Sequence, residues 1–148
     1  MSNATIRSAG MIIYYKKGND IEYLLLHYPG GYWEFAKGKM ESGETKQMTA
    51  RREIKEETGL EPELQPGFQE SIAYQFRDRY GNRTNKEVTF FIGYSTTQEV
   101  ILSHEHQGFI WLPFEQALNK LTYQNCKDLI MHADHFIREN LLKESRSE

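Results

Sequence analysis

Three glutamates at helical spacing constrain the fold of this chain more than any other feature. In the segment RREIKEETG, Glu53, Glu56 and Glu57 occupy positions i, i+3 and i+4, so a helix would project their carboxylates from one side. Like charges at these spacings oppose helix formation by about 0.2–0.5 kcal/mol per pair. Magnesium prefers oxygen ligands and is usually shared between one or two carboxylates and substrate phosphates. The segment therefore predicts either a solvated acidic helix face or a metal site.

Signals for the start and the end of a helix flank these glutamates. Thr45 is a suitable N-cap, Gly59 is a suitable stop, and Pro62 prevents the helix from continuing soon afterwards. These signals predict a helix over residues 45–58, preceded by a glycine-rich loop over residues 29–44.

The rest of the chain mixes strand and helix patterns. The predicted elements are two strands joined by a turn at Lys17–Asp20 (residues 10–28), a strand pair (67–77 and 86–95) with hairpin residues Gly81-Asn82, a strand turning into a helix at Pro113 (108–121), and an amphipathic helix (124–142). Strands with helices on two sides predict an α/β protein with the architecture of an α/β/α sandwich.

Length and composition limit the class of protein. The 148 residues fit one domain over 1–148, with disorder expected at residues 1–6 and 143–148. A single cysteine, Cys126, cannot form an internal disulfide, which favours a cytoplasmic location. No apolar run approaches the ~18–20 residues that cross a bilayer, and the net charge of −3 argues against binding extended nucleic acid. We therefore expect a monomer without a membrane partner.

The segment from Gly38 to Leu60 decides between the two interpretations of the acidic helix. It reads GKMESGETKQMTARREIKEETGL and matches the pattern G-x5-E-x7-R-E-U-x-E-E-x-G-U, in which U is a bulky apolar residue. At ordinary residue usage, a chance match to these fixed positions has a probability on the order of one in ten million. The segment resembles the Nudix box of hydrolases that cleave nucleoside diphosphates linked to another moiety. This resemblance implies a Nudix-type α/β/α sandwich with a mixed central sheet.

The resemblance also implies roles for the residues of the box. Its glutamates would hold Mg²⁺, or Mn²⁺ as a substitute, against a pyrophosphate, and one of them would be the base that activates water. The implied metal ligands are the backbone carbonyl of Gly38 and the side chains of the catalytic residues Glu53, Glu56 and Glu57. Glu44 and Arg52 would orient these side chains, since a cation beside the acidic face reduces its repulsion.

A second informative segment is SHEHQ, which contains His104, Glu105 and His106. Histidine binds zinc readily, but no cysteine or further clustered histidine completes a zinc site, so we expect ordinary loop histidines with satisfied hydrogen bonds. Together with AGMIIYY, IEYLLLHY and YWEFAKGKMESGE, the segment resembles the asymmetric diadenosine tetraphosphate hydrolases of the animal and archaeal type. This resemblance implies that Glu105 is a metal ligand from outside the box.

A dinucleoside polyphosphate requires cations along its phosphates and flat apolar faces for its bases. The candidate phosphate-binding residues are Lys37, next to the box, and Arg83 and Lys86 near the predicted hairpin, where a merely soluble loop is the alternative. Stacking on an aromatic side chain contributes about 1–3 kcal/mol per base in nucleic-acid complexes. The candidate stacking residues are Trp33, Tyr74, Phe90 and Tyr123, with core packing as the alternative.

The implied activity is metal-dependent hydrolysis of P1,P4-diadenosine tetraphosphate to ATP and AMP. Two alternatives stay open. Another Nudix substrate, such as an RNA 5′-triphosphate end or a nucleoside triphosphate, would use the same box. A catalytically silent nucleotide-binding module would be expected to have lost a box glutamate, and all of them are present.

Overall fold

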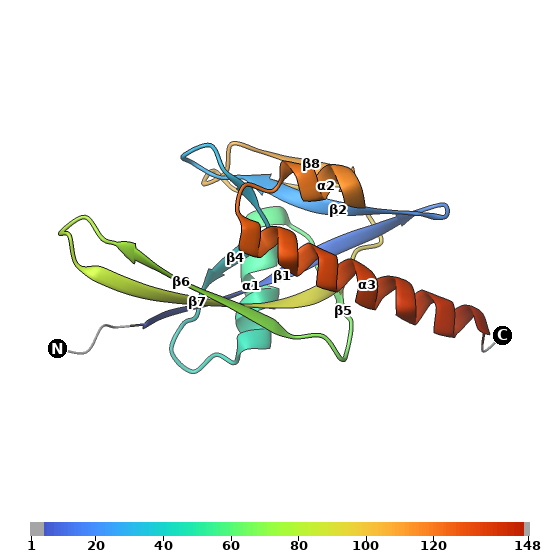
Figure 1. Cartoon of the computed structure of the whole chain (residues 1–148), viewed down its shortest axis with the longest axis horizontal. Coiled ribbons are helices and arrows are strands. Elements are labelled where there is room, and N and C mark those ends of the chain that lie inside the picture. Colours follow the sequence, from blue (N-terminus) through green and yellow to red (C-terminus); the bar gives the residue numbers. More distant parts are fainter. Residues whose placement is uncertain (1–4, 147–148) are drawn as a thin grey trace.

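The structure is a computed structural model that describes residues 5–146, and these residues form one eight-stranded sheet and three helices (Figure 1). The strands are β1 (Thr5–Lys17), β2 (Asp20–His27), β3 (Trp33–Glu34), β4 (Ala36–Lys39), β5 (Glu63–Leu64), β6 (Glu70–Arg77), β7 (Arg83–Tyr94) and β8 (Gly108–Pro113). The helices are α1 (Lys46–Thr58), α2 (Phe114–Lys120) and α3 (Gln124–Arg146).

Strand β1 organises the sheet. It pairs antiparallel with β2 through its last residues, antiparallel with β4 through its first half, and parallel with β7. Strand β6 pairs antiparallel with β7, and β8 pairs antiparallel with β2. The sheet is therefore mixed, as predicted.

Both faces of the sheet are covered. On one face, Met11 and Ile13 of β1 pack with Ala50 and Ile54 of α1. On the other face, side chains of β1, β2 and β7 pack with α2 and α3, including the fully buried Leu129. The strands lie between α1 and α3 (Figure 1). The predicted α/β/α sandwich is confirmed.

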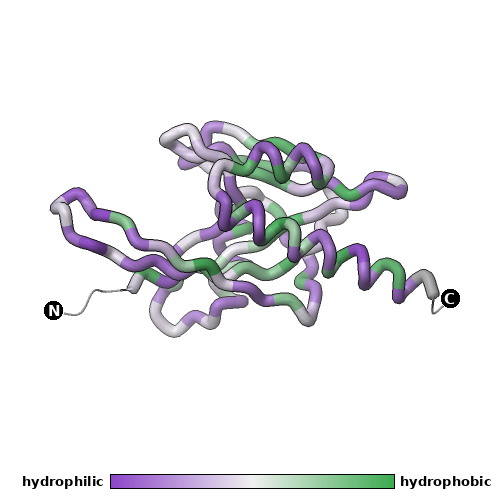
Figure 2. Tube along the Cα trace, viewed as in Figure 1, coloured by the Kyte–Doolittle hydropathy of each residue, from purple (hydrophilic) through white to green (hydrophobic). Residues whose placement is uncertain are grey.

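Apolar residues follow this layering in Figure 2, where they concentrate along the central strands and the β6–β7 hairpin tip is mostly hydrophilic.

A buried hydrogen bond joins two of the layers, since the Tyr23 hydroxyl of β2 donates to Asp134 Oδ1 of α3 at 2.6 Å. Among residues 5–146, no helix combines the length and apolar character needed to cross a bilayer.

The predicted helix over the glutamates has the expected ends. The Thr45 side chain accepts a hydrogen bond from the Met48 amide, and Gly59 adopts φ 74°, the left-handed conformation typical of a helix stop. Strand β7 begins at Arg83, three residues earlier than predicted.

Two predictions are wrong. The segment 29–44, predicted as a loop, contains β3 and β4, because its backbone completes hydrogen bonding with β2 and β1. Disorder was expected over 1–6 and 143–148, but β1 begins at Thr5 and α3 continues to Arg146. Residues 1–4 and 147–148 lie outside the described part of the chain.

Candidate active site

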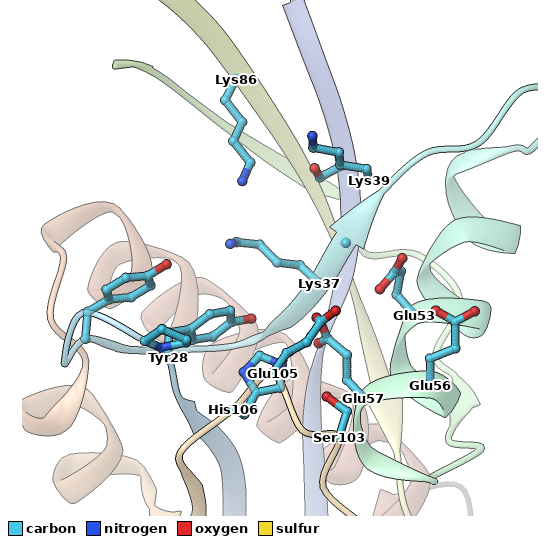
Figure 3. Close-up of a pocket in the computed structure, with 14 residues that line it drawn as sticks. Tyr28, Lys37, Lys39, Glu53, Glu56, Glu57, Lys86, Ser103, Glu105 and His106 are labelled. Atoms are coloured by element: carbon cyan, nitrogen blue, oxygen red, sulfur yellow. The ribbon is translucent and has the colours of Figure 1, made fainter. Parts of the chain in front are cut away.

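The glutamate face of α1 borders a cavity of about 550 Å³. Strands β1, β4 and β7, the turn between β2 and β3, and the loop before β8 supply its other walls (Figure 3). Its charged lining residues are Lys37, Lys39, Glu53, Glu56, Glu57, Lys86 and Glu105. Acidic and basic groups therefore meet in one open cleft, and the acidic ones are gathered at α1 and the loop before β8.

Helix packing determines how the three box glutamates point. Ala50 and Ile54 are fully buried against the sheet and fix the rotation of α1. The side chains of Glu53 and Glu57 are 14% and 7% exposed, whereas that of Glu56 is 58% exposed. The cavity thus has two enclosed carboxylates and one at its solvent edge.

Gly38 of β4 lies directly against Glu53. A Cβ atom built at Gly38 would overlap the carboxylate carbon and one carboxylate oxygen of Glu53. The φ of Gly38 is not positive, so this position requires glycine for close approach and not for backbone conformation. The contact brings the main chain of β4 beside a box carboxylate, which is the arrangement that the predicted carbonyl ligand requires.

Arg52 holds the acidic residues of the box in place. Its guanidinium donates to Glu44 Oε2 at 2.7 Å, to Glu53 Oε1 at 2.8 Å and to the Lys39 carbonyl at 2.9 Å. Glu44 also accepts hydrogen bonds from the Glu41 amide and the Thr49 hydroxyl. These contacts fix one oxygen of Glu53 against Arg52, the geometry that an orienting role needs.

The same contacts shift the acidity of the two carboxylates in opposite directions. Hydrogen bonds from Arg52 and the Glu41 amide lower the pKa of Glu44 to about 2. Burial raises the pKa of Glu53, and Arg52 only partly opposes this effect, while the charges of Glu57 and Glu56 add to it. Glu44 is therefore a permanent anion, whereas Glu53 is held in a site that disfavours an unaccompanied negative charge.

The loop before β8 docks onto the end of α1. The Ser103 amide donates to the Glu57 carbonyl at 3.0 Å, and the Ile101 amide donates to the Thr58 carbonyl at 2.9 Å. This docking brings ligand atoms of Glu57, Glu105 and His106 within 4.8 Å of one another. The predicted outside glutamate thus lies beside a box glutamate.

The expectation of a hydrogen-bonded loop histidine at position 106 is wrong. His106 is buried, and neither ring nitrogen has a hydrogen-bond partner among the described residues. Its Nε2 lies 3.3 Å from Glu57 Oε1, but the geometry does not meet that of a hydrogen bond, and Glu57 Oε2 is also without a partner. His104 is exposed on the same loop, so the two histidines have different environments.

Two of the three predicted phosphate-binding residues line the cavity. Lys37 is buried beside Glu34, with Nζ 2.9 Å from Oε1; burial alone would lower its pKa, but Glu34 outweighs this and raises it. Burial, together with the charge of Lys37, lowers the pKa of Lys86 to about 8. Arg83 is exposed at the start of β7 and does not line the cavity.

A second cavity of about 380 Å³ adjoins the first, and Tyr32 lines both. The predicted stacking residues Tyr74 and Tyr123 also line it. Phe90 does not: it is fully buried in the core against Phe35, so its assignment as a stacking residue is wrong. Trp33 stacks on the His27 ring at 4.4 Å and lines neither cavity.

The chain matches a known protein family. The family model described as NUDIX domain matches residues 4–133. The chain belongs to the Nudix family. This Nudix chain is a hydrolase, since its box glutamates are all present and its relatives are named as tetraphosphatases.

Its relatives include two enzymes named bis(5′-nucleosyl)-tetraphosphatase (asymmetrical). The Caenorhabditis elegans enzyme is 30% identical over 138 residues, which cover 89% of this chain and 96% of the relative. The mouse enzyme, from Mus musculus, is 29% identical over 145 residues and is covered to 95%. A crystal structure of C. elegans Ap4A hydrolase in a binary complex superposes with a TM-score of 0.81 at 29% identity, covering 90% of this chain and 98% of that one.

Sequence reasoning missed several residues that line the cavities of this Nudix hydrolase. They are Tyr28, Tyr32, Lys39, Ser103 and, as an unpartnered side chain, His106. Lys39 follows the fixed glycine of the box by one residue, so its position in the sequence indicated that it lies near the site. The sequence contains no such indication for the tyrosines, because they reach the cavity through the turn between β2 and β3.

Proposed function

We propose that this Nudix hydrolase cleaves P1,P4-diadenosine tetraphosphate to ATP and AMP and uses Mg²⁺, with Mn²⁺ as a substitute. The observation that carries the proposal is the junction of two cavities at Tyr32. One cavity offers carboxylates and lysines for a metal and a phosphate chain, and the other offers aromatic rings for a base. The likeness to the C. elegans and mouse tetraphosphatases supports the same substrate class.

The residues around the first cavity fit Mg²⁺. Their donors are carboxylate and carbonyl oxygens, which this hard cation prefers. Glu57 Oε2 is buried without a hydrogen-bond partner among the described residues, and such an oxygen gains most from a bound cation. The residues that would hold the metal are Gly38, Glu53, Glu56, Glu57 and Glu105.

The reaction is the attack of water on a phosphorus at one end of the tetraphosphate. A new P–O bond forms to water, the bond from this phosphorus to its bridging oxygen breaks, and AMP and ATP are the products. One of Glu53, Glu56 and Glu57 accepts the proton of the attacking water. Mg²⁺ held by these residues would supply positive charge to the phosphate chain and would make water a better nucleophile.

The lysines contribute by position. Lys37, Lys39 and Lys86 line the same cavity as the glutamates, so a phosphate chain lying between the lysines and the glutamates would meet positive charge on both sides with the metal bound. Negative charge grows on the leaving ATP during the reaction, and fixed cations stabilise it in the transition state. Glu34 holds Lys37 in place through their 2.9 Å contact.

The aromatic cavity binds one base of the substrate. Tyr74 and Tyr123 line it, and Tyr32 lies at the junction between base and phosphates, with its ring 5.6 Å from that of Tyr123. Sequence-tolerant stacking of this kind contributes about 1–3 kcal/mol per base. Trp33 and Arg83 have no role in this arrangement.

A product assay tests the proposal. The protein is incubated with diadenosine tetraphosphate, nucleoside triphosphates and a 5′-triphosphorylated RNA, each with Mg²⁺ or Mn²⁺, and the products are separated by chromatography. We expect ATP and AMP in equal amounts from the tetraphosphate, at a higher kcat/KM than for any other substrate. Preferred release of pyrophosphate from a triphosphate or from RNA would contradict the substrate assignment.

Substitution of Glu57 tests the metal site. Since general-base and metal-ligand glutamates act in the reaction itself, Glu57→Gln should reduce kcat by at least about 10²-fold. Glu61→Gln is the matched control, because Glu61 is exposed beyond the end of α1 and its only ion pair with a described residue is the one with Lys55 at 3.1 Å. Activity of the Glu57 variant within about fivefold of the parent, with cation binding intact, would rule out the role assigned to this residue.

Hydrolysis of a nucleoside triphosphate is the second candidate, because a single base fills the aromatic cavity and a triphosphate also reaches the glutamates. The two candidates differ in the leaving group, which is ATP from the tetraphosphate and pyrophosphate from a triphosphate. A kcat/KM for a nucleoside triphosphate above that for the tetraphosphate, with pyrophosphate as the product, would support the second candidate.

A further inference from the structure

We propose that His106 supplies a nitrogen ligand to a first-row transition-metal ion held together with Glu57 and Glu105. This inference rests on the proposed function, since it concerns a divalent cation in the same cleft. It adds a donor that an all-oxygen magnesium site lacks. The consequence is that one metal position in this hydrolase favours a transition-metal ion over Mg²⁺.

The geometry suits a shared ion. A carboxylate oxygen and an imidazole nitrogen each lie about 2.0–2.2 Å from a bound zinc ion, so two ligands of one such ion are at most about 4.4 Å apart. The ligand atoms of Glu57, Glu105 and His106 lie within 4.8 Å of one another before any ion draws them together. A side-chain movement of a few tenths of an ångström closes that difference. Figure 3 shows the three side chains close to one another at the C-terminal end of α1.

The burial of His106 points to a ligand. The residue is 9% exposed and its side chain 2% exposed, yet both ring nitrogens have no hydrogen-bond partner among the described residues. A buried polar group left unpaired costs about 1–3 kcal/mol. Glu57 Oε2, on the neighbouring side chain, is unpaired as well. A cation between the two groups would bind Glu57 Oε2 and one ring nitrogen of His106.

The ring of His106 is held in a fixed plane. It stands edge-to-face with Tyr28, with centroids 4.5 Å apart and planes at 83°. Tyr28 is itself fixed, because its hydroxyl donates to the Phe35 carbonyl at 2.7 Å. The imidazole is therefore preorganised, which reduces the entropy lost when it binds an ion.

A simple ion pair between His106 and Glu57 is the competing explanation. Their closest atoms are 3.3 Å apart, but the pair leaves Glu57 Oε2 without a partner among the described residues. The two explanations differ in a measurable way, because only ligation places a histidine nitrogen in contact with the metal. Imidazole is a common ligand of transition-metal ions, whereas Mg²⁺ takes oxygen ligands and water.

Pulsed electron paramagnetic resonance of the full chain loaded with Mn²⁺ alone tests the inference directly. We expect electron spin-echo modulation from a directly bound imidazole ¹⁴N, and its replacement by the ¹⁵N pattern when the protein is labelled with ¹⁵N-histidine. This result requires no variant and no substrate. Bound Mn²⁺ with no nitrogen coupling, or failure of Mn²⁺ to bind, would overturn the inference, whereas the proposed function is decided separately by the product assay with Mg²⁺.

Variants add a second readout. His106→Gln should abolish the nitrogen coupling and weaken Mn²⁺ binding by at least about tenfold, the smallest loss typical when a group around a metal is removed, while Mg²⁺ binding changes less than threefold. His104→Gln is the matched control, since His104 is exposed on the same loop. Thermal unfolding without metal verifies that both variants fold. Nitrogen coupling that survives in the His106 variant, or equal weakening of both cations, would contradict the assignment.

Discussion

Substitution of Gly38 by alanine isolates the contact between β4 and the box. The new Cβ would overlap the Glu53 carboxylate, which Arg52 holds at 2.8 Å, so Glu53 must leave its position. Loss of that charged hydrogen bond costs about 1.5–3 kcal/mol. The smaller entropy of the unfolded alanine chain returns about 0.4–1 kcal/mol. The net destabilisation is about 0.5–2.6 kcal/mol, which lowers Tm by roughly 1–10 °C at this chain length.

The loss of activity should be larger than the loss of stability suggests. A displacement of about 1 Å at a catalytic group can reduce the rate about 10²-fold, so we expect kcat to fall by at least that factor while the folded fraction at 25 °C is unchanged. The assay is tetraphosphate hydrolysis with saturating Mg²⁺, together with thermal unfolding.

Gly108→Ala is the matched control, since a Cβ there meets no atom within 4 Å and φ is not positive. The reasoning fails if the Gly38 variant keeps kcat within about fivefold of the parent, or if the Gly108 variant loses as much.

Three further predictions concern substrate binding and stability. The kcat/KM for the tetraphosphate should fall as pH rises through about 8, because Lys86 loses its charge there, and Lys86→Arg should remove this decline since arginine stays charged; an unchanged decline in the variant would refute it. Tyr123→Ala should raise KM about tenfold with little change in kcat, because about 1–3 kcal/mol of stacking is lost, and an unaltered KM would remove the base from this cavity. Tyr23→Phe should lower the free energy of unfolding by about 1–3 kcal/mol in urea denaturation, since Asp134 Oδ1 loses its donor while Arg138 still donates to Oδ2; a change below about 0.5 kcal/mol would contradict this.

The helix and the acidic site were predictable because their signals are local. The N-cap at Thr45, the stop at Gly59 and the i, i+3, i+4 spacing of the glutamates each depend on residues within a few positions of one another. Placement of Glu105 beside Glu57 is long-range and came only from a resemblance.

The stacking residues were harder to predict because the sequence of a strand does not show which of its side chains face the cavity and which face the core. From Val88 to Ile92, every side chain of β7 is buried, since helices cover both faces of the sheet. Alternation therefore gives no sign that Phe90 belongs to the core. At the start of β3, neighbouring side chains point to opposite faces of the sheet. Tyr32 therefore lines the cavity, whereas Trp33 does not.

The unpaired state of His106 could not be predicted from the sequence, because burial of a loop side chain depends on what packs over it. Here the covering group is Tyr28, which lies 78 positions earlier in the chain. No pattern within the segment SHEHQ distinguishes this histidine from the exposed His104.

The parallel pairing of β1 with β7 bears on synthesis of the protein in the cell. Tyr14 is paired with Tyr94, so the growing chain lengthens by 80 residues before β1, already next to β2 and β4, gains its parallel neighbour β7. At about 5–20 residues per second, this takes roughly 4–16 s on the ribosome. During that interval the apolar edge of the first hairpin is available to chaperones and to other nascent chains. We therefore expect the soluble yield to depend on translation speed and chaperone supply.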